Sequence, residues 1–428
     1  MISFCIALSL THIAFSWTFC GFFFLFLSVK DMTKSAGKTI PIRGIIMFIA
    51  VLQCLLVPAL VYEVKSFSDI YNMMGIDSSS YFSFVFPALI AYAIGLYWKR
   101  KTFEHQIKCL KQYETKGWVL MGIGLFANVV KLGFVSFLLS LLLFIGLFYI
   151  LLSTFKYRYL ILSLVVGVSI YSSLSGAMFH VILIWLLFIF FILNLRKKMS
   201  TRLIVVAFIV GIGFLIVIQV VKPLLRERLW YQSTSFSTSD AIQESVAHIQ
   251  FKDNAMEDFV IRMNQGRHIS MVMSYIPKKA SYGNGSSYLK SIVSSIFPRF
   301  LLPNKASAGG RENMLRFAGY ELQQGTSMDI GLLGEAYGNF GYSGIIALFF
   351  IGLLFGQTIN YVEKRAQKTP ELLLWLPFLF FQVIKIETSS ATVFNHLAKS
   401  ALLVWFMFSK YIILLPFSNR LKKITVRE

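Results

Sequence analysis

Residues 334–358 read GEAYGNFGYSGIIALFFIGLLFGQT, and Glu335 is the single charged residue among them. A helix of about 20 consecutive apolar residues crosses the roughly 30 Å of hydrocarbon in a lipid bilayer. The stretch therefore predicts a membrane-spanning helix that begins with a carboxylate. Because similar apolar runs recur on both sides of it, this stretch sets the fold class of the whole chain.

The composition of the 428-residue chain supports the same class. Hydrophobic residues make up 56% of it and charged residues 14%, and the mean hydropathy is +0.67. Soluble domains are about 45–50% apolar and about 25% charged. These values exclude one large soluble domain and a disordered chain. We expect an all-α polytopic membrane protein with about 11 transmembrane helices.

The apolar segments divide the chain into three parts. We expect a membrane bundle at 1–221, one large loop at 222–329, and a second membrane part at 330–428 that ends in a basic tail. The eleven segments have approximate bounds 3–29, 44–62, 83–98, 117–132, 134–154, 159–173, 177–194, 203–221, 334–358, 371–387 and 397–417.

The net charge of +21 is distributed unevenly among the connections. The loops after the odd-numbered segments and the C-terminal tail hold 23 basic residues, whereas the opposite short loops hold mainly Lys65 and Lys131. The positive-inside rule assigns the basic side to the cytoplasm, which leaves the N-terminus outside and the C-terminus inside. Residues 1–29 are followed by basic residues and preceded by none, so we expect a retained helix instead of a signal peptide.

The predicted outer loop, 222–329, contains 13 basic and nine acidic residues. Seven of the basic residues are arginine. Long loops escape the positive-inside rule, so a solvated basic face is one interpretation. Arginine also binds phosphate and carboxylate groups bidentately, so an anion site is the other. The cysteines lie outside this loop and show neither a disulfide framework nor a metal-type spacing.

The same loop has predicted local structure. Helical periodicity extends over 240–275, a short amphipathic helix is predicted at 288–297, and Gly309-Gly310 is a flexible joint before 311–329. Arg262 and Arg267 with the adjacent His268 form either a solvated basic face or an anion site near the membrane surface.

Two further segments carry chemistry. Pro298-Arg299-Phe300-Leu301-Leu302-Pro303-Asn304-Lys305 predicts a rigid irregular strip. It is either a packing device, or Arg299 and Lys305 bind a diphosphate while the apolar residues meet a lipid chain. In 334–344, one helical stripe holds Gly334, Gly338 and Gly341, which predicts close helix contact. The neighbouring stripe is polar and consists of Glu335, Asn339 and Tyr342.

A carboxylate at the end of a membrane span is a functional-site hypothesis by default. Lys385, Glu387, His396 and Lys399 lie at the same predicted end of spans ten and eleven. They are either snorkelling interface residues or part of one outer cavity. The small polar hairpin predicted at 172–180 lies on the same side and is a weaker candidate for lining that cavity.

Sequence motifs for nucleotide, serine-hydrolase and metalloprotease chemistry are absent from the chain. The sequence has no Walker A loop, HExxH, GxSxG or GxGxxG fingerprint, and no Asp-rich pair that would hold a metal with nucleotide sugars. No nucleotide is supplied outside the cytoplasmic membrane, so a transferase acting there needs a lipid-linked donor.

The strip 298–305, followed by Thr326-Ser327 and by Gly334-Glu335-Ala336-Tyr337-Gly338-Asn339-Phe340-Gly341-Tyr342-x-Gly344, resembles the Wzy-type O-antigen and oligosaccharide repeat-unit polymerases. The number of spans, the large outer loop and the basic cytoplasmic face match that family too. The chain departs from it at the central outer hairpin, where many members carry an arginine and this chain has Ala177-Met178 after Ser175-Gly176.

The resemblance implies an all-α fold related to the membrane C-type glycosyltransferases, in the bacterial cytoplasmic (inner) membrane. It implies a glycosyltransferase that joins undecaprenyl-diphosphate-linked oligosaccharides during synthesis of lipopolysaccharide O-antigen, capsule or exopolysaccharide. We expect no cofactor, no metal and no nucleic acid, and as partners the lipid bilayer and the flippase and chain-length regulator of the same pathway. The expected catalytic residues are Glu335 and His268. The expected residues for binding diphosphate or glycan are Arg262, Arg267, Arg299, Lys305, Arg311, Tyr337 and Asn339.

Three alternatives remain open at this point. An O-antigen ligase has a similar topology but a different acceptor. A flippase or transporter for lipid-linked oligosaccharides is the rival from another class, although no internal repeat is visible and the polar residues gather at the outer ends of the spans. A structural scaffold is the third alternative, and it leaves the basic outer loop without a purpose.

Overall fold

The computed structural model describes residues 16–63, 73–101, 103, 109–130, 133–175, 179–200, 202–204, 206, 210–211, 213, 260–297, 310–323 and 328–408. Every regular element within these residues is a helix, so the predicted all-α class is confirmed for them. Most of the predicted span 203–221 and most of the predicted helix 240–275 lie outside the described residues.

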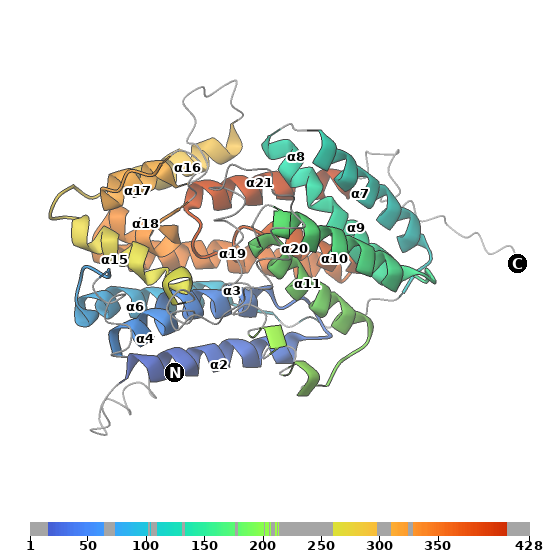
Figure 1. Ribbon diagram of the computed structural model, residues 1–428, viewed down its shortest axis with the longest axis horizontal. Helices are drawn as coiled ribbons and strands as arrows, with labels where there is room; N and C mark the ends of the chain where they lie inside the picture. The colour runs from blue at the N-terminus through green and yellow to red at the C-terminus, as the bar shows by residue number, and fades with distance from the viewer. Residues whose placement is uncertain are drawn as a thin grey trace, which may run out of the picture.

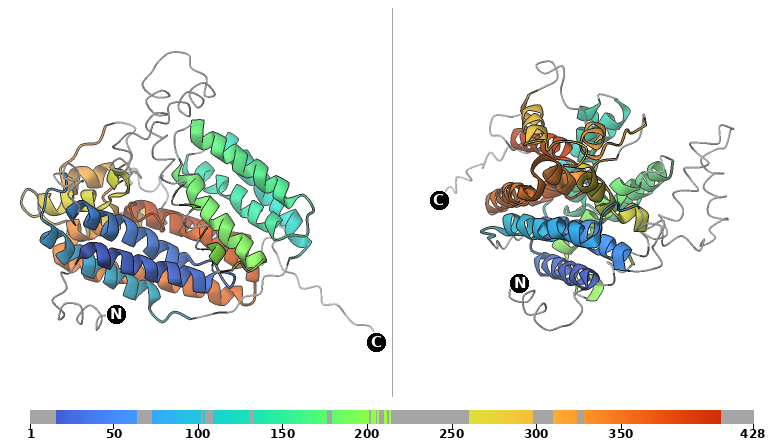
Figure 2. Two further views of the ribbon diagram at one scale, coloured as in Figure 1. Left: turned by 60° about the horizontal axis from the view of Figure 1, so that its bottom comes forward. Right: turned by 90° about the vertical axis from the view of Figure 1, so that its left-hand side faces the viewer.

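The N-terminal part contains α2 (Trp17–Ser35), α3 (Ile42–Val51), a π-helical turn (Leu52–Leu56), α4 (Val57–Glu63) and α6 (Ser78–Tyr97). It continues with α7 (Gln112–Val129), α8 (Phe134–Ser140), α9 (Leu142–Leu151), α10 (Arg158–Ser175) and α11 (His180–Arg196). Figure 2 shows α7 to α11 as a second group of helices beside the group that contains α2, α3, α6 and α19.

The C-terminal part begins with three short helices, α15 (Gly266–Tyr275), α16 (Ser286–Ile296) and α17 (Arg311–Ala318). It ends with α18 (Gly331–Phe340), α19 (Gly344–Ala366), a 3₁₀ turn (Pro370–Trp375), α20 (Leu376–Phe380) and α21 (Ser390–Met407). The amphipathic helix predicted at 288–297 is confirmed as α16. In Figure 1, α15 to α18 gather at one end of the elongated bundle.

Among the described residues, three helical segments are long and apolar enough to cross a membrane, by length and composition: Ile42–Glu63, Ser78–Tyr97 and Gly331–Ala366. Shorter apolar helices cover Val135–Leu151, Arg158–Leu174, Val181–Arg196 and Pro370–Phe380. These segments support a membrane protein, while the total of eleven spans stays a prediction.

The hydropathy of 334–358 predicts one continuous helix, but the structure has two helices there. α18 ends at Phe340, Gly341 takes a positive φ of 57°, and a 3₁₀ turn leads into α19. The predicted polar stripe is therefore wrong at its third member. Tyr342 is 51% exposed and shares a 2.9 Å hydrogen bond with Ser83 Oγ, whereas Glu335 and Asn339 are fully buried.

The last two predicted spans also differ from the structure. The segment 371–387 is a 3₁₀ turn, a five-residue helix and further turns, because Pro377 lacks the amide hydrogen that a continuous helix needs. α21 begins at Ser390, before the predicted start at 397. Its first turn is polar and therefore escapes a hydropathy window, but it is buried against Glu335.

Glycines bring the backbones of α6 and α19 into contact. A Cβ on Gly352 would lie 2.3 Å from Tyr92 O, and one on Gly356 would lie 2.4 Å from Leu96 O. From the other helix, a Cβ on Gly95 would lie 2.1 Å from Phe349 O. Small residues four apart allow such approach between membrane helices. The close contact predicted for α18 also exists, but Gly338 packs there against Phe317 of α17.

Ion pairs join the helices at the other end of the bundle. Arg43 of α3 contacts Glu363 of α19 at 3.1 Å, and both are buried. Arg100, after α6, pairs with Asp31 of α2. Lys116 of α7 pairs with Glu371 at 2.7 Å. All three cations belong to the predicted connections with the basic excess, and each pairs with an acidic residue of another segment of the chain.

Replacing Gly352 by alanine is expected to destabilise the bundle by about 1–3 kcal/mol, because the new methyl group overlaps the backbone of α6. The measurement is the thermal unfolding temperature of the detergent-solubilised protein. Gly167→Ala is the matched control, since no atom lies within 4 Å of the position that its Cβ would take. Equal unfolding temperatures for the two variants would contradict the contact between α6 and α19.

Candidate functional site

Glu335 lies at the centre of a buried polar cage. Its Oε1 accepts hydrogen bonds from Ser287 Oγ of α16 at 2.6 Å and from Ser390 Oγ of α21 at 2.7 Å. Its Oε2 accepts a bond from the backbone N–H of Ser390 at 2.7 Å. The side chain is 0% exposed. The carboxylate thus connects three helices that lie far apart in the sequence.

Asn339 and two serines extend the cage. Asn339 Nδ2 donates to Ser287 Oγ at 2.7 Å, and Ser390 Oγ, which donates its proton to Glu335, lies 2.9 Å from Ser291 Oγ. The turn before α16 attaches to the end of α18 through the backbone bonds Gly283 N–H to Gly338 O and Asn284 N–H to Asn339 O. A Cβ at Gly283 would lie 2.6 Å from Asn339 Oδ1, so glycine is needed for this approach.

Two carboxylates satisfy the N-terminus of α21. The first backbone N–H groups of a helix have no partner within the helix, and the helix dipole makes them favourable partners for anions. Asp329 Oδ2 accepts from Ser389 N–H at 3.0 Å, and Glu335 Oε2 accepts from Ser390 N–H. Asp329 Oδ1 also accepts from Ile330 N–H at 2.8 Å. Acidic residues on the start of α18 therefore cap a helix that begins 55 residues after Glu335.

A hydrogen-bonded chain links His268 of α15 to this cap. His268 Nδ1 and Gln265 Oε1 are 3.0 Å apart, and Gln265 Nε2 donates to the backbone oxygen of Asp329 at 3.0 Å. Because the amide nitrogen of Gln265 is the donor, its oxygen accepts, and Nδ1 of His268 carries the proton. Nε2 of the neutral ring is then left with a lone pair.

Burial changes the pKa values of His268 and Asp329, the two titratable groups in this series of hydrogen bonds. It lowers the pKa of His268 to about 4, with a further contribution from the charge of Arg267. Burial raises the pKa of Asp329 to about 7, and the charge of Glu335 adds to the rise against the three hydrogen bonds that favour the ionised form. At neutral pH His268 is therefore uncharged and Asp329 is near the midpoint of its titration.

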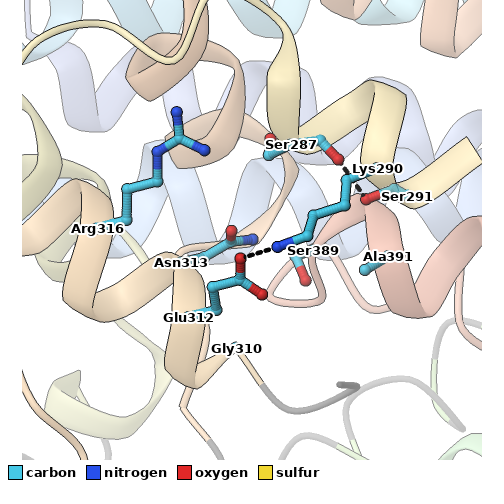
Figure 3. A pocket seen from close by; sticks show the side chains of 9 residues that line it. All are labelled: Ser287, Lys290, Ser291, Gly310, Glu312, Asn313, Arg316, Ser389 and Ala391. Atoms are coloured by element: carbon cyan, nitrogen blue, oxygen red, sulfur yellow. Dashed lines mark hydrogen bonds and ion pairs between the residues drawn. The ribbon is translucent and has the colours of Figure 1, made fainter. Parts of the chain in front are cut away.

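A polar cleft opens beside the cage, between α16, α17 and the start of α21. Figure 3 shows Lys290 reaching across it from α16 to Glu312 of α17, with which it forms an ion pair, while Arg316 lies further along α17. Ser287, Ser291 and Ser389 connect the lining of the cleft to the cage. The complete lining is Ser287, Lys290, Ser291, Gly310, Glu312, Asn313, Arg316, Ser389 and Ala391.

The charges of the cleft are two cations and one carboxylate. The side chains of Lys290 and Glu312 are 48% and 49% exposed, and exposed ion pairs contribute only about 0–1 kcal/mol. An incoming anion can therefore replace Glu312 as the partner of Lys290 at little energetic cost. Arg316 contributes a guanidinium that also lies 5.0 Å from the centre of the Phe317 ring. The arrangement suits a phosphate or carboxylate group more than a cation.

The structure places most of the predicted site residues at this end of the bundle. Glu335 and Asn339 form the cage. Tyr337 is buried beside them, with its ring 4.9 Å from Phe84 and 6.4 Å from Tyr282. Arg311 is the exposed first residue of α17 and borders the cleft between Gly310 and Glu312. These assignments stay predictions.

The remaining predicted residues are less central. Arg267 is half-buried on α15, and Arg262 is exposed just before that helix. Arg299 and Lys305 lie outside the described residues. Of the weaker candidates, His396 is buried with Nε2 2.8 Å from Phe378 O, and the ammonium group of Lys385 lies 4.5 Å from the centre of the Phe381 ring. The two residues therefore contact Phe378 and Phe381 respectively, in and just after α20, and neither lines the cleft.

Sequence patterns do not group Lys290, Glu312, Asn313 and Arg316, and they do not identify the cage serines. One signal was available, since Ser287, Ser291 and Ser294 recur at helical spacing in the helix predicted there. Their partner Ser390 is 99 residues beyond Ser291, and no local pattern joins the two. Comparison of the chain with protein-family models, with curated proteins and with solved structures found no match.

Glu335→Ala is expected to lower the free energy of unfolding by about 1–3 kcal/mol, because it leaves the buried N–H of Ser390 without an acceptor. Glu335→Gln is the matched control for the fold, since its amide oxygen can accept from that N–H and its nitrogen can donate to the serine hydroxyls. The measurement is thermal unfolding in detergent. An alanine variant as stable as the glutamine variant would contradict the cage.

Asp329 predicts a pH-dependent stability. Its pKa is about 7 in the folded protein against an ordinary value of 3.8, so folding favours the protonated form. This contribution is complete at acid pH and is lost as the pH rises toward 7. The unfolding temperature of the wild type is expected to fall, relative to that of Asp329→Asn, between pH 5 and pH 8. The titration of His268 has the opposite sign but is common to both proteins, so a constant difference between them would contradict the assignment.

Proposed function

We propose that the chain is a polysaccharide polymerase that joins undecaprenyl-diphosphate-linked oligosaccharide repeat units on the outer face of the bacterial cytoplasmic membrane. One observation carries the proposal. Glu335 and Asn339, which belong to the motif that resembles the Wzy-type polymerases, are hydrogen-bonded to Ser287, and Ser287 lines the cleft that holds Lys290 and Arg316. A motif from the end of a membrane helix and two cations from the predicted outer loop thus meet at one place.

The cations supply the chemistry that this reaction needs. A hydroxyl oxygen of the acceptor sugar attacks the anomeric carbon of the donor, a new glycosidic bond forms, and the bond from that carbon to the diphosphate oxygen breaks. Negative charge develops on the departing undecaprenyl diphosphate. Lys290 and Arg316 are positioned to stabilise that charge, as preorganised donors do in many active sites. Exchange of Glu312 for the diphosphate would free Lys290 for this role.

The proton of the acceptor hydroxyl needs a base. His268 is one candidate, because its neutral ring has a lone pair on Nε2. Its low pKa makes it a weak base. Glu335 is the other candidate of the sequence analysis. Its oxygens already accept three hydrogen bonds and are enclosed, which favours a role in positioning Ser287 and Ser390 in this conformation.

The expected result of removing one cation is a slower reaction. Purified protein in detergent is mixed with lipid-linked repeat units, and chain growth is followed on a gel. Wild type is expected to form polymers, and Arg316→Ala to slow growth by on the order of 10-fold or more, as loss of a charged hydrogen-bond donor does. Lys368→Ala, an exposed cation beyond the other end of α19, is the matched control.

Each alternative function gives a different outcome in this assay. A flippase produces no chain growth, because translocation leaves the repeat units unjoined. A ligase produces no homopolymer but transfers repeat units to added lipid A-core. Unchanged growth in Arg316→Ala and in Lys290→Ala would retain the polymerase and refute the cleft as its diphosphate site.

A further inference from the structure

Helix α16 turns its apolar side outward and its small polar side inward. Ser287, Ser291 and Ser294 are 7%, 2% and 2% exposed. On the other side, the exposed fractions are 65% for Leu289, 46% for Ile292, 66% for Ile296 and 45% for Phe297. A surface helix of a soluble domain shows the reverse arrangement, with its apolar stripe facing the core.

The inward side of α16 packs as membrane helices pack. Small residues allow two helices to approach, and hydroxyl groups then bond across the contact. Ser291 and Ser287 reach Ser390 and Glu335 in this way, and α16 lies along α21. α21 itself exposes large apolar side chains, including Leu402 at 63% and Trp405 at 65%. The exposed stripe of α16 therefore has the same character as the outer surface of its neighbour.

The direction of α16 points to the same environment. Figure 1 shows α16 running alongside α21, along the length of the bundle, and not across its end. Its 11 residues rise about 16 Å, roughly half of a 30 Å hydrocarbon core. Gly310, the next described residue after Phe297, lines the cleft with Ser287 and Lys290 and so lies near the start of α16.

We propose that α16 is a re-entrant helix that enters the outer leaflet beside α21 and presents Leu289, Ile292 and Ile296 to lipid chains. Residues 286–297 then belong to the membrane part of the protein and not to a soluble outer loop. Lys290, near the start of the helix, is at the level of the lipid head groups, where a cation pairs with Glu312 or with lipid phosphate. The cleft consequently opens sideways toward the bilayer.

This inference does not depend on the polymerase proposal, since it concerns only the surroundings of α16. Under that proposal it adds a route, because a substrate with a lipid tail can reach Lys290 and Arg316 from within the leaflet. The other possible occupant of the apolar stripe is a protein, such as a second copy of the chain, and the experiment below separates it from lipid.

The test measures the surroundings of single spin labels in liposomes. Leu289, Ile292 and Ile296 are replaced one at a time by cysteine, with Cys5 and Cys109 changed to serine and the buried Cys20 and Cys54 retained. Accessibility to oxygen, which concentrates in lipid, is compared with accessibility to a water-soluble nickel chelate. The lipid control is Phe350→Cys, at a 59% exposed position on α19, and the water control is Lys279→Cys.

The expected ratio of oxygen to nickel accessibility is severalfold above that of Lys279→Cys at all three positions, and it increases from Leu289 to Ile296 as the helix goes deeper. A ratio equal to that of Lys279→Cys would overturn the proposal in favour of an aqueous surface. Labels that neither reagent reaches would overturn it in favour of a protein contact.

A second measurement needs no substitution. Wild-type protein is placed in liposomes that contain a phospholipid with a photoactivatable diazirine on its acyl chain, and labelled peptides are identified after irradiation. The peptide containing 286–297 is expected to carry label at a level similar to peptides of α19. Its absence from the labelled set, with α19 labelled, would refute the re-entrant helix even if every cysteine variant failed to fold.

Discussion

A carboxylate that is fully buried needs hydrogen-bond donors from its surroundings, and Glu335 imposes this constraint on the end of the molecule where α15 to α18 gather. Desolvation disfavours the charge strongly unless the donors are fixed around it. The donors come from α16 and from the first residue of α21, while Glu335 itself belongs to α18. Three helices from separate parts of the chain must therefore meet with their backbones correctly placed. With Asp329, the same carboxylate also satisfies the start of α21, so one set of bonds fulfils two needs that would otherwise each be costly.

The cleft follows from this arrangement. Once Ser287 and Ser390 are fixed on Glu335, α16 and the start of α21 form two sides of a recess, and α17 closes the third with Glu312 and Arg316. The turn that enters α16 is held to the end of α18 by two backbone bonds, which require a glycine at 283. Gly341 ends α18 at the same level with a positive φ, so Tyr342 leaves the buried stripe and α19 starts in a new register. The local geometry of one motif thereby sets both the cage and the boundary of the next span.

Much of the fold could be predicted from the sequence, because apolar runs and short-range periodicity are local. The apolar helices predicted at 83–98 and 159–173 and the amphipathic helix predicted at 288–297 follow from patterns within about 20 residues, and the structure has helices at 78–97, 158–175 and 286–296. The break at Gly341 could not be predicted from hydropathy, since glycine is common inside membrane helices and the apolar run continues through it. The start of α21 was placed too late, because its polar first turn is stabilised by carboxylates 55 and more residues away. The cleft was missed for the same reason, as Lys290, Arg316 and Ser389 approach each other only in the folded chain.

The arginine excess of the predicted outer loop indicates the location of the cleft only in part. Among the arginines that the structure describes in 222–329, Arg316 lines the cleft, Arg311 borders it, and Arg262 and Arg267 lie on or before α15. The second cation of the cleft is Lys290, on the serine-rich helix α16.

The cations of the cleft are available because of the way in which Glu335 is stabilised. Its partners in the described part of the chain are hydroxyl and amide groups, so the buried negative charge does not consume Lys290 or Arg316. The carboxylate that faces Lys290 is the half-exposed Glu312, which an external anion can displace. The buried acid is satisfied by neutral donors, and the partner of the neighbouring Lys290 is weakly held, so the positive charge of the cleft stays available to an anion.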